Sequence, residues 1–372
     1  MMLFQPPLPP MYRELSEAEM GERVRAHKRS FGERLVILGH HYQQDDVIQF
    51  ADYTGDSLKL SQLAAKAMRA EYVVFCGVHF MAESADILTD ERVAVILPDL
   101  SAGCSMADMA AIEQVEDAWD YFAAVTDERI IPVTYVNSAA SVKAFVGRHG
   151  GACCTSSNAR RVLEWALSQG DKVLFLPDQH LGRNTAYAMG FPLDSMAVYD
   201  PHEPDGGLSD DRVRGAKFLL WKGHCSVHAL FTEKHCDDVR AADPACQILV
   251  HPECRWAVVQ KADLAGSTEY IIKTIDEAPE GSRWAVGTEI HLVNRLAERH
   301  AGRKVVRSLA GVQCLCTTMY RIDLPHLLWS LDELAAGRIV NQVKVDPETR
   351  HWAVVALQRM LENVHAQPVG AK

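Results

Sequence analysis

Short apolar segments recur along this chain, and each one stops at a group of polar residues. The first, at 34–38, reads RLVIL and runs directly into GHHYQQDD at 39–46. Helical patterns such as that of 57–69 separate one apolar segment from the next. Strands that are apolar on both faces and alternate with helices are typical of parallel βαβ units. The sequence therefore predicts an α/β protein with short parallel sheets.

The pattern occurs in three rounds, and at 372 residues the chain is too long for one ordinary core. We therefore expect three similar α/β modules, a repeat of architecture and not of sequence. The segment 189–215 breaks the rhythm with many turn-forming residues and is predicted to be an inserted surface loop. The expected strands are 34–38, 72–75 and 93–97, then 129–134, 151–154 and 172–176, then 247–250 and 283–286.

The strand ends carry chemically useful side chains. The segment at 129–134 is followed by Tyr135, Val136 and Asn137, and that at 247–250 by His251, Pro252 and Glu253. In open parallel sheets, ligands bind outside the carboxyl ends of the strands, where loops and helix N-termini supply hydrogen-bond donors. Three sheets that present such edges to one another would enclose a single polar site.

Composition excludes several classes of protein. The formal net charge is −11, whereas a nucleic-acid surface needs clustered Lys and Arg, so we expect no nucleic-acid partner. The N-terminus lacks the pattern of a signal peptide, and no apolar run approaches the roughly 20 residues of a membrane helix. We expect a cytoplasmic protein with no membrane partner, in which the ten cysteines are reduced.

Three cysteines occupy equivalent places, because each follows an apolar run and a turn. They are Cys104, Cys225 and Cys316, the last of which has Cys314 two residues before it. The chain contains no Cys-x-x-Cys, which disfavours a zinc ribbon or a ferredoxin-type cluster. Three thiolates could instead bind an iron–sulfur cluster and leave one iron open as a Lewis acid, or all could be structural thiols. Spacing alone does not separate Cys314 from Cys316.

From about residue 35 to 334 the chain resembles quinolinate synthase, an iron–sulfur enzyme of NAD biosynthesis. Eleven short motifs carry the resemblance, in order and across all three modules. They are GHHYQ (39–43), GDSL (55–58), FMAE (80–83), GCSMA (103–107), YVN (135–137), CTS (154–156), GHC (223–225), HPE (251–253), GST (266–268), GTE (287–289) and CTTM (316–319).

The resemblance implies three α/β/α domains arranged in a triangle around a central active site. It implies a 4Fe-4S cluster held by Cys104, Cys225 and Cys316, with one open iron, and leaves Cys314 as a bystander. We expect the first domain to span 1–103 and to be completed by helices in 317–372. The second domain is expected at 104–224, with the inserted loop, and the third at 225–316.

The activity that the resemblance implies is condensation of iminoaspartate with dihydroxyacetone phosphate to give quinolinate, phosphate and two waters. L-aspartate oxidase or aspartate dehydrogenase is the expected source of iminoaspartate. Two rivals from other classes stay open. One is a non-catalytic zinc or iron–sulfur protein that uses the same three cysteines, and the other is a related cluster-dependent dehydratase acting on another hydroxy acid.

Four residues are predicted to be catalytic. By resemblance, His40 and Tyr42 lie in the active site, with Tyr42 transferring or orienting a proton; a core aromatic is the alternative. Glu253 is the predicted general base, because condensation and aromatisation require proton removal beside carbonyl or imine carbons. A Glu that merely opens a helix is the alternative. His251 is expected to bind a carboxylate or shuttle a proton.

Hydroxyl side chains stand where helices are expected to begin. They can cap the helix, bind an anion, or do both, and both expected substrates are anions. The resemblance assigns Ser57, Ser156, Thr268, Tyr135 and Asn137 to the dicarboxylate substrate. The predicted substrate-binding set is His40, Ser57, Tyr135, Val136, Asn137, Ser156, His251, Pro252, Glu253, Ser267 and Thr268.

Overall fold

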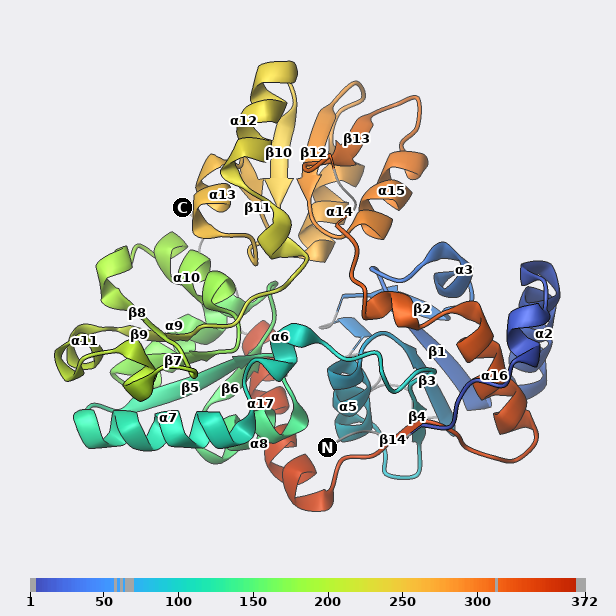
Figure 1. Ribbon diagram of the computed structural model, residues 1–372, viewed down its shortest axis with the longest axis horizontal. Coiled ribbons are helices and arrows are strands. Elements are labelled where there is room, and N and C mark those ends of the chain that lie inside the picture. The colour runs from blue at the N-terminus through green and yellow to red at the C-terminus, as the bar shows by residue number, and fades with distance from the viewer. Residues whose placement is uncertain (1–4, 57–58, 61–62, 64–69, 312–313, 366–372) are drawn as a thin grey trace. The chain divides into compact units, whose positions relative to one another are not determined.

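The computed structural model (Figure 1) describes residues 5–56, 59–60, 63, 70–311 and 314–365. The chain divides into two compact units. The first unit comprises Met1–Cys104, Glu289–Arg295 and Leu315–Val345, and the second comprises Ser105–Thr288, Leu296–Cys314 and Asp346–Lys372. Three short sheets, all parallel except for one edge strand, have helices on both sides. The chain is an α/β protein built of three-layer α/β/α sheets, as the sequence predicts.

The first unit holds one sheet with the strand order β14-β4-β3-β1-β2, in which only β14 is antiparallel to its neighbour. Its strands are β1 (Leu35–His40), β2 (Tyr53–Gly55), β3 (Tyr72–Cys76), β4 (Ala94–Ile96) and β14 (Gln342–Val343). Its described helices are α1 (Met11–Glu14), α2 (Glu17–Phe31), η1 (Gly32–Arg34), α3 (Asp45–Ile48), α5 (His79–Leu88), η5 (Met319–Arg321) and α16 (Leu324–Ala335).

The second unit holds two parallel sheets, β6-β5-β7-β9-β8 and β11-β10-β12-β13. The strands of the first sheet are β5 (Ile130–Tyr135), β6 (Ala152–Cys154), β7 (Lys172–Leu176), β8 (Met196–Tyr199) and β9 (Phe218–Trp221). The helices that accompany it are α6 (Ser105–Asp108), α7 (Ile112–Val125), α8 (Ala140–Arg148), α9 (Ala159–Gln169), α10 (Gln179–Ala188), η2 (Leu193–Ser195), η3 (Pro204–Gly207), α11 (Asp210–Gly215) and α17 (Pro347–His365). The strands of the second sheet are β10 (Gln247–Val250), β11 (Leu264–Ala265), β12 (Arg283–Gly287) and β13 (Val305–Ser308). The helices that accompany it are η4 (His228–Leu230), α12 (Glu233–Ala242), α13 (Trp256–Lys261) and α14 (Thr268–Glu277). The helix α15 (Ile290–Arg299) is divided between the two units after Arg295.

The central strands are buried on both faces, which explains why they read as continuous apolar runs. Every residue of β7 and β9 is buried, and Val173, Leu174 and Phe175 have no exposed surface. The register brings particular strand ends together, because Val250 pairs with Gly287 and Tyr135 pairs with Cys154. His251 and Thr288 therefore follow neighbouring strands at one edge of the third sheet.

All strands expected from the sequence are present, with ends shifted by at most two residues. The helix expected over 57–69 lies largely outside the described residues, and Ser57 lies entirely outside them. None of the helices in the described ranges combines the length and apolarity needed to cross a membrane.

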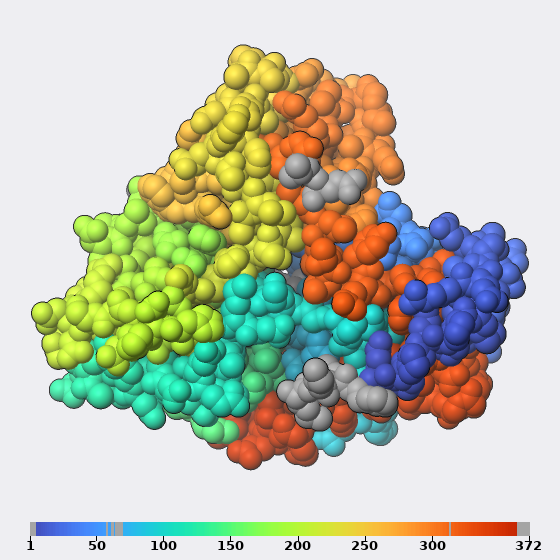
Figure 2. All heavy atoms as spheres, in the orientation of Figure 1, coloured from blue at the N-terminus to red at the C-terminus, as the bar shows by residue number. Residues whose placement is uncertain are grey.

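The prediction that 189–215 is a surface loop was wrong. The segment contains the strand β8, which pairs in parallel with β9, and the helix α11, whose Val213 is fully buried. It lies at the surface of the second unit (Figure 2), where β8 forms the edge of the sheet. A four-residue edge strand between two 3-10 turns is too short to show a period in sequence. Gly206, at φ 67°, lies so near Tyr199 that a Cβ would be 2.0 Å from its ring.

The two C-terminal helices pack in different units. α16 contacts α2 in the first unit, whereas α17 contacts α8, β6 and α9 in the second. The expected domain limits placed all of 317–372 with the first domain, and α17 departs from that placement. The reason is a complementary pair of faces: Gly147 on α8 lets the backbone of α17 approach it, and Ala353, Ala356 and Leu357 are fully buried.

The contact between α8 and α17 gives a test of stability. A Cβ at Gly147 would lie 2.0 Å from the carbonyl oxygen of Trp352, so the backbones would have to separate. We expect Gly147→Ala to lower the free energy of unfolding by about 1–3 kcal/mol, although Ala favours helix. Gly215→Ala, at the end of α11 with nothing within 4 Å of a new Cβ, should be neutral or slightly stabilising. Equal urea midpoints for the two variants would contradict this close approach.

Candidate active site

The turn His251-Pro252-Glu253-Cys254 follows β10 in the second unit and is almost completely buried. Glu253 is 3% exposed and His251 2%. The amide of His251 donates to the carbonyl of Gly287, at 3.1 Å, and the amide of Cys254 donates to the carbonyl of His251, at 3.0 Å. These bonds fix the turn to the end of the neighbouring strand β12. They place a carboxylate in the interior, where it needs hydrogen-bond donors.

Glu253 receives two such donors from distant parts of the chain. The Tyr135 hydroxyl, at the end of β5, donates to Oε1 at 2.6 Å, and His228 Nδ1 donates to Oε2 at 2.8 Å. His251 Nδ1 lies 3.7 Å from Oε1, and the rings of His228 and His251 stack with centroids 4.5 Å apart. Tyr135, His251 and Glu253 were all predicted site residues, and the structure brings these three together.

His228 is a member of this cluster that sequence reasoning missed. Its second ring nitrogen, Nε2, lies 3.2 Å from the Thr288 hydroxyl. The ring of His228 thus bridges Glu253 and Thr288, and the two hydrogen bonds fix its orientation. The available signal was position, since His228 stands three residues after Cys225 and a Cys-x-x-His spacing is typical of metal or catalytic sites.

Cys225, His228 and Glu253 also form a set that can hold a metal ion. One ligand atom from each lies within 4.8 Å of the other two, and Cys225 is the most exposed of the three. Thiolate, imidazole and carboxylate together suit zinc or iron.

Burial and charge set the protonation of this cluster. Burial raises the pKa of Glu253, but the neighbouring His251 and His228 and the hydrogen bonds from His228 and Tyr135 more than offset it, so the pKa lies well below its ordinary value. Burial lowers the pKa of His251 to about 3, against the opposing effect of Glu253. At neutral pH, Glu253 is therefore ionised and His251 is neutral.

Asp178 is a second buried carboxyl that the sequence analysis left without a role. It has no exposed surface, and its Oδ1 accepts from the amides of His180 and Leu181 at the start of α10. Its Oδ2 has no hydrogen-bond partner among the described residues. Burial and the charge of Glu253 both raise the pKa of Asp178 well above its ordinary value. The strand end that precedes it, Leu176-Pro177, was the only available signal.

The remaining predicted residues of the second unit lie at strand ends or helix starts. Asn137 is half-buried, and its buried Oδ1 lacks a partner within the described ranges. The Ser267 hydroxyl accepts from the amide of Tyr270 at 3.3 Å, so it caps α14, and Thr268 is buried in the first turn of that helix. Ser156 is half-buried in the turn after β6, and the amide of Val136 donates to the carbonyl of Cys154 at 2.8 Å.

In the first unit, His40 and Tyr42 lie side by side at the end of β1. Their ring centroids are 4.7 Å apart with planes at 81°, and the amide of Tyr42 donates to His40 Nδ1 at 3.1 Å. His40 is buried and Tyr42 is half-buried. The structure places these two side chains next to each other, and their roles in the active site stay predictions.

Exposure divides the ten cysteines into two groups. Cys104, Cys225 and Cys316 are half-buried, and the other seven, Cys314 among them, are buried. Cys104 and Cys316 belong to the first unit and Cys225 to the second. Burial raises the pKa of the Cys316 thiol, and the Thr318 hydroxyl, 3.5 Å from Sγ, works in the opposite direction. The three partly exposed thiols are those that stand at equivalent places in the sequence.

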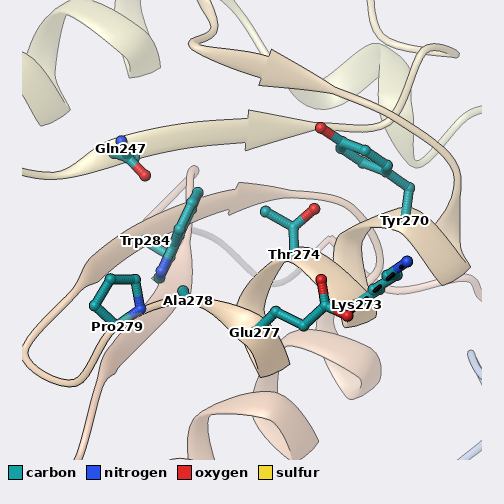
Figure 3. A pocket seen from close by; sticks show the side chains of 8 residues that line it. All are labelled: Gln247, Tyr270, Lys273, Thr274, Glu277, Ala278, Pro279 and Trp284. Carbon is teal, nitrogen blue, oxygen red and sulfur yellow. Dashed lines mark ion pairs between the residues drawn. The ribbon is translucent and has the colours of Figure 1, made fainter.

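A shallow groove of about 490 Å³ lies elsewhere in the second unit, along α14 (Figure 3). Gln247 and Trp284, which line it, belong to the amino-terminal ends of β10 and β12. Lys273 and Glu277 form an ion pair across one wall, with 3.9 Å between Nζ and Oε1. This groove is therefore at the opposite end of the strands from the Glu253 cluster, and it is not the candidate site.

The fold and the cluster define an α/β enzyme with ionisable groups gathered at the carboxyl ends of parallel strands. Comparison with known proteins identifies its family, because residues 22–362 match the model of the family described as quinolinate synthetase A protein. The chain belongs to this family.

Close relatives agree with the family match. A quinolinate synthase of Acidobacterium capsulatum is 58% identical over 355 residues, covering 94% of this chain and 95% of its own. Those of a Geobacillus species and of Streptomyces coelicolor are 58% and 56% identical, covering 95% and 93% of this chain and 96% and 89% of theirs.

The low pKa of His251 predicts a loss of stability in acid. As the pH falls below 6.5, the unfolded chain binds a proton at this histidine and the folded chain does not until about pH 3. The contribution to the free energy of unfolding should therefore fall by about 2 kcal/mol between about pH 7.5 and about pH 5. His251→Gln should show a correspondingly smaller fall in urea unfolding. The same pH dependence in both proteins would contradict a buried neutral His251.

Proposed function

We propose that the protein is a quinolinate synthase, which condenses iminoaspartate with dihydroxyacetone phosphate to quinolinate, phosphate and two waters. The family match over residues 22–362 carries this proposal. The product would enter NAD biosynthesis, and L-aspartate oxidase or aspartate dehydrogenase would supply iminoaspartate. Because such a protein needs reduced thiols, we also propose a cytoplasmic location.

We further propose a 4Fe-4S cluster bound by Cys104, Cys225 and Cys316. Partial exposure of these three thiols, against burial of the other seven, supports the choice, since a ligand must reach an ion that a buried packing thiol cannot. When bound, a cluster with one open iron supplies a Lewis acid for oxygen or nitrogen groups of the substrate. Cys314 is the bystander because it is fully buried.

Glu253 is the proposed general base. Its carboxylate is ionised and accepts hydrogen bonds from Tyr135 and His228, which leave it able to take a proton but lower its basicity. A substrate group that draws the Tyr135 hydroxyl away would raise its basicity at the moment of binding. His251, neutral at working pH, can donate to a substrate carboxylate or pass a proton on.

The other predicted residues are proposed to bind and orient the two anionic substrates. Helix starts with hydroxyl groups suit carboxylate and phosphate. The proposed contacts of this kind are Thr268, Ser267, Ser156 and Ser57, the last of which lies outside the described residues. Asn137 brings a buried amide oxygen without a partner in the described chain, which a substrate N–H or O–H would satisfy. Tyr135, Val136 and Pro252 would complete the walls, and His40 with Tyr42 would orient or protonate the substrate.

The proposal is tested by anaerobic purification. We expect a brown protein with about four irons per chain that forms quinolinate from the two substrates. Cys104→Ser, Cys225→Ser and Cys316→Ser should each lose the cluster and the activity, because each removes one thiolate.

Matched controls come from the buried thiols. Cys314→Ser and Cys246→Ser should retain iron and activity, since both side chains pack in the interior. A zinc-containing protein without turnover would refute the enzyme and favour a structural metal bound by Cys225, His228 and Glu253. Normal iron in one of the three serine variants would remove that residue from the ligand set.

Replacing the proposed base separates chemistry from assembly. Glu253→Gln keeps the size of the side chain and should retain the cluster, while kcat falls by about 100-fold or more. Iron content, the visible spectrum and single-turnover quinolinate formation are the measurements. Turnover within a factor of about three of the unmodified enzyme would assign the base elsewhere.

A further inference from the structure

A single amide holds two carbonyl groups of the Glu253 turn, those of the residues before and after Glu253. Asn184 Nδ2, on α10, donates to the carbonyl of Pro252 at 2.8 Å and to the carbonyl of Cys254 at 2.8 Å. Asn184 is only 6% exposed. Its Oδ1 has no hydrogen-bond partner among the described residues, so both side-chain hydrogen bonds of Asn184 there are those that Nδ2 donates to this turn.

These two bonds replace what the sheet can no longer supply. β10 ends at Val250 and α13 begins at Trp256, so Pro252 and Cys254 lie in neither a strand ladder nor a helix. Buried carbonyls without a donor are costly, and one side chain satisfies two of them here. The Asn184 bonds fix the peptide plane before Glu253 and the one after Cys254, so the backbone that carries Glu253 is held at both ends and with it the direction in which the carboxylate points.

The helix that carries Asn184 is itself firmly placed. Asp178 caps its start, and the amide of Gln179 donates to the carbonyl of Gly223 at 3.0 Å. Gly182 lets α10 lie against Phe175 and Leu220, because a Cβ at position 182 would lie 2.7 Å from the ring of Phe175. α10 therefore belongs rigidly to the sheet of β7 and β9, whereas Glu253 belongs to the sheet of β10.

We propose that Asn184 is a positioning residue that aims the Glu253 carboxylate at the reacting group. The inference rests on the proposed function, because it assigns Glu253 to proton transfer. Asn184 connects the turn of Glu253, which follows β10, to the sheet of β5, β7 and β9. Tyr135, at the end of β5 in that sheet, is then within hydrogen-bond distance of the Glu253 carboxylate. A displacement of about 1 Å in such a group can cost about 100-fold in rate.

Asn184→Asp is the informative substitution. It preserves the shape and volume of the side chain, but it replaces two N–H donors with an oxygen that faces two carbonyl oxygens. The turn should then lose its clamp while the surrounding packing persists. Asn341→Asp is the matched control, because Asn341 is 7% exposed, its Nδ2 donates to the carbonyl of Pro98 at 2.8 Å, and it lies in the first unit.

Two measurements on the full-length, cluster-loaded protein test the proposal. Hydrogen exchange followed by mass spectrometry should show the amides of 251 and 253–256 exchanging about tenfold faster in Asn184→Asp and unchanged in Asn341→Asp. Steady-state kinetics should show kcat lowered about 10- to 100-fold with KM within about threefold and iron content unchanged, whereas Asn341→Asp keeps kcat within about twofold.

The two arms separate failure of this inference from failure of the proposed function. Unchanged exchange at 251 and 253–256, or a kcat for Asn184→Asp within twofold of the unmodified enzyme, overturns the positioning role. Equal losses of kcat in both Asn variants also overturn it, because they indicate general destabilisation. If the unmodified protein forms no quinolinate, the proposed function falls, and the exchange comparison alone decides whether Asn184 clamps the turn.

Discussion

An ionised carboxylate buried in protein is expensive unless donors surround it, and the second unit is arranged around that requirement. Glu253 is 3% exposed, and its partners come from the end of β5, from the segment after Cys225 and from its own turn. Each partner is placed by a different element: Tyr135 by β5, His228 by the 3-10 helix η4 and His251 by the turn after β10. The sheet of β5 and the sheet of β10 must therefore both be complete before the carboxylate is stable.

The neighbouring carboxyl shows the same constraint from the other side. Asp178 has hydrogen-bond donors for one oxygen only, and burial together with the charge of Glu253 raises the pKa of Asp178. The groups around Glu253 instead lower the pKa of Glu253. The pKa values of two carboxyl groups in one buried region are thus shifted in opposite directions. Environments that separate two pKa values in this manner are typical of sites that handle protons.

The sequence predicted most of this arrangement because its signals are local. Continuous apolar runs such as 172–176 revealed the strands. Tyr135 and Glu253, which follow the expected strands 129–134 and 247–250, proved to be neighbours. It failed where the signal is short or non-local. β8 has only four residues, and nothing in the sequence near Asn184 indicates that its amide would meet the carbonyls of Pro252 and Cys254, 68 and 70 residues further on.

The packing of α17 on α8 also has a consequence for synthesis. α8 ends at Arg148, and the helix that covers it starts only at Pro347; the pair Arg148–Glu348 that joins them is 200 residues apart in sequence. While a ribosome builds the protein from its N-terminus, the face of α8 around Gly147 stays uncovered until residues 347–365 have emerged. The second unit therefore cannot complete its packing before α17 has been made, and chains that stop short of α17 would carry an open apolar surface that favours aggregation.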